Sequence, residues 1–136
     1  MNIKRSLFLA AAVLTTTIAI SAQETPRWLR RSATSPDGSK VVFCYQGDIF
    51  TVSSDGGRAL QITTNEAYDS DPIWTPDGKK IVFSSYRAGS KDIFITSAEG
   101  GAPKRLTDYP GNETPLCVLD GNRVLFQANI QQDALY

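Results

Sequence analysis

Short apolar runs separated by turn residues recur along the chain after its first two dozen residues. Val41-Val42-Phe43, Ile81-Val82-Phe83 and Val124-Leu125-Phe126 are apolar at successive positions, which is typical of strands covered on both faces. An apolar spacing of about 3.6 residues, which would indicate helices, does not occur in this part of the chain. The pattern predicts an all-β fold built from short strands.

Each run belongs to a longer repeat that begins with a turn sequence. Ser35-Pro36-Asp37-Gly38 precedes the first run, Thr75-Pro76-Asp77-Gly78 the second, and the shorter Val118-Leu119-Asp120-Gly121 the third, at intervals of 40 and 43 residues. Proline presets φ for a type I turn, aspartate bonds the nearby backbone, and glycine takes the left-handed position. A repeat of this length is typical of four-stranded β-propeller blades.

The repeat predicts an incomplete β-propeller over residues 23–136. Its blades are expected at about 27–64, 70–108 and, truncated, 114–136. In the second blade the strands are expected near 71–74, 80–84, 92–96 and 103–107. A propeller closes with about four to eight blades, so these two and a half blades are expected to belong to a longer polypeptide. A homo-oligomer is the alternative.

A segment of different character precedes the repeat. Lys4 and Arg5 are followed by an apolar run over residues 7–20 that ends at Ser21-Ala22. This order predicts a secretory signal peptide over residues 1–22 and a periplasmic or secreted protein. An uncleaved membrane anchor is the alternative, although the run is short for a span of about 20 residues.

Charge excludes two classes of partner. The 14 basic and 14 acidic residues balance, and loss of residues 1–22 removes two of the basic ones. The remaining Lys and Arg residues are scattered over turns and loops, without a basic stripe or patch. We therefore expect no nucleic-acid partner and no membrane contact after signal cleavage.

The residue types present give little support for catalysis or metal binding. The chain has no histidine, which excludes a Ser-His-Asp or Cys-His nucleophile and a His-ligated zinc within these residues. Cys44 and Cys117 are expected to be separate buried thiols. Glu66, Asp69 and Asp71 could supply oxygen ligands to calcium, but they lack the glycine and terminal glutamate of a dedicated loop. No catalytic residue, metal or cofactor is expected.

Tyrosines give the strongest indication of a binding surface. Because strands alternate in direction within a blade, the loop after the second strand and the connection to the next blade open on the same rim. The candidate binding residues on this rim are Tyr45, Tyr68, Tyr86, Arg87 and Tyr109. Arg87 and Lys91 come from a four-residue insertion on the same rim. Aromatic rings beside cations suit peptide recognition, and the alternative is that each tyrosine only covers the end of its own blade.

The repeat resembles a known group of propellers. Pro72-Ile73-Trp74-Thr75-Pro76-Asp77-Gly78 with the following strand, and Lys104-Arg105-Leu106-Thr107, are similar to the WD-like repeats of the TolB and tricorn protease group. Residues 41–52 and 105–111 resemble the start of tricorn-like peptidases. In that family, propellers precede a PDZ domain and a serine peptidase domain, so its catalytic serine and histidine have no counterpart in this chain.

The resemblance implies a segment of an exported serine peptidase that shapes substrate access or binds peptide. Its expected partners are a peptide or unfolded protein substrate and the downstream peptidase domains of the same chain. Two alternatives remain open. One is a TolB-like periplasmic protein-binding propeller without enzymatic activity, and the other is the propeller of a prolyl-oligopeptidase-like hydrolase. The third turn, which lacks proline, departs from the repeat pattern but keeps its glycine.

Overall fold

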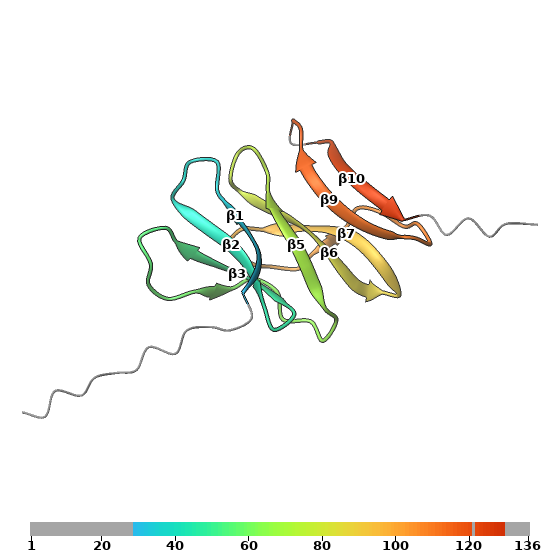
Figure 1. Ribbon diagram of the computed structural model, residues 1–136, viewed down its shortest axis with the longest axis horizontal. Helices are drawn as coiled ribbons and strands as arrows, with labels where there is room; N and C mark the ends of the chain where they lie inside the picture. The colour runs from blue at the N-terminus through green and yellow to red at the C-terminus, as the bar shows by residue number, and fades with distance from the viewer. Residues whose placement is uncertain (1–28, 121, 130–136) are drawn as a thin grey trace, which may run out of the picture.

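The computed structural model describes residues 29–120 and 122–129, which form ten strands in three antiparallel sheets and no helix (Figure 1). The first sheet has the order β1 (Arg30–Thr34), β2 (Lys40–Tyr45), β3 (Asp48–Ser53) and β4 (Leu60–Gln61). The second has the order β5 (Asp69–Trp74), β6 (Lys80–Ala88), β7 (Ser90–Ser97) and β8 (Lys104–Arg105). The third pairs β9 (Asn112–Val118) with β10 (Val124–Asn129). The predicted all-β propeller architecture, with two complete blades and part of a third, is confirmed.

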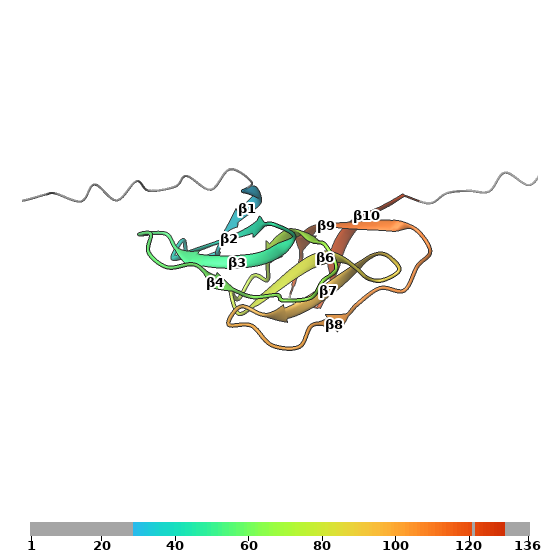
Figure 2. The same ribbon diagram turned by 90° about the horizontal axis from the view of Figure 1, so that it is seen from below.

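The three sheets lie side by side in chain order. Figure 2 shows β1 and β9 along one side of the molecule and the short fourth strands β4 and β8 along the other. The first strands contact one another from blade to blade, β1 with β5 and β5 with β9. Among the described residues, no helix is long and apolar enough to cross a membrane. The predicted signal peptide, residues 1–22, lies outside the described residues.

The insertion in the second blade extends a hairpin instead of forming a loop. Ala88 pairs with Ser90 across the end of β6 and β7, and Gly89 takes a φ of 106° between them. Its N–H donates to the carbonyl oxygen of Tyr86 at 3.1 Å. The Arg87 N–H donates to the Ser85 hydroxyl oxygen at 3.2 Å, and β6 and β7 are longer than β2 and β3.

The Pro-Asp-Gly turns form as their sequence predicts. Asp37 Oδ1 accepts hydrogen bonds from the Ser35 hydroxyl at 2.6 Å and from the Ser39 N–H at 3.1 Å. Gly38 has a φ of 75° and donates to the Ser35 carbonyl oxygen at 2.9 Å. Asp77 makes the corresponding bonds in the second blade. Each hairpin is thus closed by side chain and backbone together.

The core lies between neighbouring blades, where one face of a sheet packs against the opposite face of the next sheet. Trp74 Nε1 donates to the Ala33 carbonyl oxygen at 3.0 Å and links the first strands of the first two blades. Ser84 Oγ donates to the Glu113 carbonyl oxygen at 2.8 Å and links the second blade to the third. One face of the first blade packs against the opposite face of the second, through a cluster that includes Val42, Cys44 and Ile49 from the first and Trp74, Ile81, Phe83 and Phe94 from the second.

The outward faces of the two end blades are less covered. Phe83 and Phe94 stack with their centroids 6.1 Å apart and are buried. Their counterparts in the first blade, Phe43 and Phe50, stack at 5.8 Å and stay half-buried. On the third blade, Leu125 is 52% exposed. Burial of equivalent positions therefore depends on whether a neighbouring sheet covers them.

This difference in burial predicts that the same substitution lowers the free energy of unfolding by unequal amounts at two equivalent positions. Phe83→Ala should lower the free energy of unfolding by about 3–5 kcal/mol, because it leaves a cavity between two sheets. Phe43→Ala should cost roughly half of that or less, since part of its ring is already in water. Urea unfolding of the two variants measures both values. Equal costs would contradict the open face and indicate that another sheet covers Phe43.

The first turn predicts a titration that NMR can follow. Hydrogen bonds from the Ser35 hydroxyl, then from the Ser39 N–H and hydroxyl, lower the pKa of Asp37 from 3.8 to about 2. Because the folded-state pKa is lowered, the stabilisation is present above the unfolded pKa and is lost as the pH falls from about 4 towards 2. Ser35→Ala should shift the pKa back towards 3.8. An Asp37 that titrates at its ordinary value in the unsubstituted protein would refute the turn geometry.

Candidate functional site

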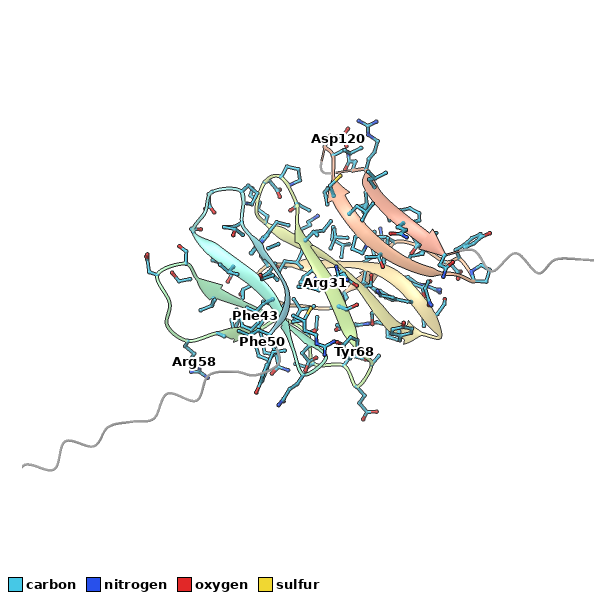
Figure 3. All side chains as sticks on the ribbon, viewed as in Figure 1. Arg31, Phe43, Phe50, Arg58, Tyr68 and Asp120 are labelled. Carbon is cyan, nitrogen blue, oxygen red and sulfur yellow. The ribbon has the colours of Figure 1, made fainter. Side chains whose placement is uncertain are left out.

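The predicted rim exists at one end of the sheets. The Asp69 N–H donates to the Gly47 carbonyl oxygen at 2.7 Å, and the Tyr86 N–H lies 3.4 Å from the Tyr68 carbonyl oxygen. The connection that carries Tyr68 is thereby held between the hairpins of the first and second blades. Figure 3 shows Tyr68 at this end, with Asp120 at the opposite end.

The tyrosines of the rim differ in exposure. Tyr68, Tyr86 and Tyr109 are 49%, 43% and 44% exposed, whereas Tyr45 is half-buried with its ring edge towards Phe50 at 6.0 Å. Three rings are thus available to a partner, and Tyr45 also covers the end of its blade. Tyr109 lies in the connection from β8 to β9, and its carbonyl oxygen accepts from the hydroxyl of Ser90 in the second blade at 3.2 Å.

Tyr68 is seated directly on Gly47. A Cβ added to Gly47 would lie 3.2 Å from Tyr68 Cδ2, and Gly47 has a φ of 93°, which side chains rarely tolerate. The glycine therefore serves two purposes. It makes the hairpin turn and leaves room for the tyrosine ring.

Arg87 is turned inwards instead of being displayed on the rim. Its Nη2 donates to both carboxylate oxygens of Asp69, at 2.9 and 2.8 Å, and Asp69 is fully buried. The guanidinium carbon also lies 5.5 and 5.0 Å from the ring centroids of Phe83 and Phe94. The buried carboxylate requires a cation, and Arg87 supplies it. Asp69, Phe83 and Phe94 all belong to the same blade as Arg87, so contacts within the second blade explain its position.

Acidic residues at the start of each third strand use different partners. Asp48 accepts from the Gln61 side-chain amide at 2.9 Å, and its equivalent Asp92 accepts from Arg105 Nη2, also at 2.9 Å. Burial raises the pKa of Asp48, although hydrogen bonds from Gln61 and Thr63 act in the opposite direction. In both blades the acid fastens the fourth strand to the third.

A second ionic group connects all three first strands. Asp71 in β5 contacts Arg31 Nε at 3.1 Å and Lys91 Nζ at 2.7 Å. Lys91 Nζ also lies 3.2 Å from the Thr114 hydroxyl oxygen in β9. Burial acts to raise the pKa of Asp71, but hydrogen bonds from Lys91 and Ser70 and the two cations lower it. The carboxylate is therefore held in its charged form.

Sequence reasoning missed Arg31 as part of this group. Arg31 and Asp71 occupy equivalent repeat positions and take φ values of 48° and 53°, at matching register shifts in β1 and β5. The 40-residue alignment could have paired them, but the bulge that turns the side chains together has no clear sequence signal.

The acidic residues considered for calcium do not form a ligand set. Asp69 is bound by Arg87, Asp71 by Arg31 and Lys91, and Glu66 is exposed. Nowhere in residues 29–120 or 122–129 do three acidic, cysteine or histidine side chains form a group that could hold a metal ion.

Two hollows adjoin the Tyr68 ring. One, of about 460 Å³, is lined by Arg30, Gln46, Gly47 and Tyr68. The other, of about 410 Å³, is lined mainly by Arg30, Arg31, Cys44, Tyr68, Asp71 and Lys91. They share Arg30 and Tyr68, so together they form a hollowed surface beside the exposed tyrosine.

The cysteines do not form an activated thiol. Cys44 is buried and free, and burial raises its pKa to about 12, which keeps it protonated and unreactive at neutral pH. Cys117 is also free but half-buried, because the outward face of the third blade lies open. The expected separate thiols are therefore present, with Cys117 less buried than predicted.

Comparison with curated proteins places the chain among much longer relatives. It is 31% identical over 108 residues to "Uncharacterized peptidase YuxL" of Bacillus subtilis, an alignment covering 71% of this chain and 16% of that protein. It is 34% identical over 74 residues to "Tricorn protease homolog 1" of Streptomyces coelicolor, covering 54% of this chain and 7% of the relative. The chain thus spans a small part of these relatives.

Solved structures and a family profile agree on the architecture. A putative TolB from Agrobacterium tumefaciens superposes with a TM-score of 0.68 at 28% identity, covering 79% of this chain and 40% of that one. The tricorn protease structure superposes with a TM-score of 0.52 at 17% identity, covering 65% and 10% of the two chains, which supports the fold alone. The profile described as "Tricorn protease N-terminal beta propeller domain" matches residues 26–134. The chain therefore belongs to the tricorn protease N-terminal β-propeller domain family.

Proposed function

We propose that this chain is a peptide-recognising propeller segment of an exported tricorn-like serine peptidase. In this proposal the rim shapes substrate access and the chain itself carries no catalytic residue. The observation that carries it is the group of exposed tyrosines beside two hollows at one end of the blades. Family membership and relatives named as tricorn protease homologs support the peptidase part.

The chemistry of the rim suits an extended polypeptide. Tyrosine rings offer flat apolar area together with a hydroxyl, at little cost in conformational entropy. Side-chain amide and cationic groups line the neighbouring hollows and can meet peptide carbonyl oxygens. A surface of this kind recognises exposed main chain and mixed side chains, as an unfolded substrate presents them.

Catalysis is assigned to other parts of the parent protein. The chain has no histidine to serve as a general base, and the thiol of Cys44 is kept protonated by burial. The buried acids Asp69, Asp71 and Asp92 are all held in ion pairs between or within blades. A serine nucleophile with its base would have to come from downstream domains. Export is assigned to the signal sequence predicted over residues 1–22.

A TolB-like protein-binding propeller without enzymatic activity is the second candidate. The structural similarity to a putative TolB, which has the higher TM-score of the two structures above, favours it. A prolyl-oligopeptidase-like hydrolase is a further alternative, supported only by similarity to a protein named as a peptidase. All of these assign a binding role to the propeller and differ in what the parent protein adds.

Substitution of two rim tyrosines tests the binding role. Tyr68→Ser combined with Tyr86→Ser should weaken binding of a fluorescein-labelled extended peptide about tenfold, because exposed aromatic anchors carry much of such an affinity. The melting temperature should barely change, since both side chains are exposed. Fluorescence anisotropy and thermal unfolding measure the two effects.

Two control variants separate binding from folding. Leu119→Ser removes an exposed apolar side chain in the turn at the opposite end and should leave peptide binding intact. Arg87→Gln should lower stability by about 3–5 kcal/mol, because it leaves the buried Asp69 carboxylate without its cation. Unchanged peptide affinity in the double tyrosine variant would refute the proposed surface.

A further inference from the structure

Cations outnumber acids in the hollow of about 410 Å³ beside Tyr68. Arg30, Arg31 and Lys91 contribute to its wall, whereas Asp71 is the only acidic side chain among the described residues that line it. Arg31 and Lys91 both pair with Asp71, so these three groups leave about one formal positive charge over, and Arg30 lies beside them. A low-polarity wall from Cys44 and the Tyr68 ring lies beside these charges. An anionic group is the ligand that such a surface attracts.

Asp71 leaves most of the Arg31 donor capacity unused. It contacts Arg31 only through Nε, at 3.1 Å, and takes Lys91 Nζ at 2.7 Å with its other oxygen. The Arg31 side chain is 72% exposed, and among the described residues its charged contact is the ion pair with Asp71. A guanidinium carries five N–H donors in a planar fork that matches a carboxylate. Its terminal nitrogens can therefore receive a second carboxylate.

The backbone holds Arg31 in an uncommon conformation for this purpose. Its φ of 48° lies in the left-handed region, which a long side chain seldom adopts. The pairing of β1 with β2 shifts register here, and the matching shift in β5 carries Asp71 at a φ of 53°. Two aligned bulges bring the guanidinium beside the acid of the next blade. Conformations of this kind concentrate at binding sites.

The hollow of about 460 Å³ indicates the direction in which a bound peptide would extend. It shares Arg30 and Tyr68 with the cationic hollow and extends past Gln46 and Gly47. A chain bound at the cations can therefore proceed along the Tyr68 ring instead of ending there. This geometry favours a carboxylate within a peptide over one at its end.

We propose that the hollow bounded by Arg31, Lys91 and Tyr68 recognises an aspartate or glutamate side chain within an extended peptide. This inference rests on the proposed peptide-binding function of the rim and specifies the residue type that it selects. The ligand carboxylate accepts from the terminal nitrogens of Arg31, and Lys91, which pairs with the other oxygen of Asp71, adds its charge. The peptide backbone on one side of the acidic residue lies along Tyr68.

Binding of matched peptides to the full chain tests this selectivity. The probes are fluorescein-labelled peptides of about 12 residues with blocked ends, identical except for a central Glu or Gln. The Glu peptide should bind about five- to tenfold more tightly at low salt, as expected for a solvated charge-assisted contact. The preference should shrink at high ionic strength.

Variants assign the preference to Arg31. Arg31→Gln should bring the Glu-to-Gln ratio close to one, and Arg31→Lys should keep part of it, because the charge remains while the fork is lost. Arg58→Gln removes the same charge from an exposed position in the connection before β4, which Figure 3 shows away from Arg31, and should leave the ratio unchanged. Circular dichroism confirms that each variant keeps its strand signal.

Each outcome distinguishes the two proposals. Equal affinity for the Glu and Gln peptides would overturn the acidic selectivity while leaving the peptide-binding rim in place. No binding of either peptide would overturn both. A third probe, the Gln peptide with a free terminal carboxylate, tests the alternative source of the anion. If it binds as tightly as the Glu peptide, the hollow recognises chain ends and the assignment to an internal residue is wrong.

Discussion

This structure depends on the packing of one face of each sheet against the opposite face of the next sheet. Val42 and Ile49 of the first blade are buried only because the second blade brings its opposite face, with Phe83, against them. A single blade of a repeat protein cannot bury its apolar face alone and depends on its neighbours for stability. Where no neighbouring sheet is present among the described residues, equivalent side chains such as Phe43 remain half-exposed. Stability is therefore a property of blade pairs.

The same contacts build the rim. Stacking brings Asp69 and Asp71 of one first strand against the neighbouring blade, where burial requires each carboxylate to find a cation. Arg87 pairs with Asp69 and is thereby mostly buried. Arg31 and Lys91 pair with Asp71 and line the hollow beside the Tyr68 ring. One set of ion pairs thus neutralises the buried carboxylates, and its Arg31 and Lys91 side chains line the hollow proposed as a binding site.

Sequence alone predicted the features that local chemistry determines. The Pro-Asp-Gly turns and doubly covered strands follow from bonds within a few residues, as at Asp37, so the fold and its repeat were accessible. The orientation of Arg87 could not be predicted from the sequence, because it depends on a buried carboxylate 18 residues away and on two aromatic faces. The left-handed bulge at Arg31 was also missed, since nothing in its local sequence requires it. Tyr68 was placed correctly at the rim because strand alternation fixes which loops share an end.

The mass of the native protein tests most directly the claim that this chain is a propeller segment of a larger peptidase. An antibody raised against residues 23–136 would be used to probe the exported fraction of the source cell. We expect a band several-fold larger than the 14.8 kDa of this chain, of a size that accommodates further propeller blades and a peptidase domain. A band of about 40–50 kDa, enough for one propeller and a small domain, would contradict the peptidase and favour a binding protein.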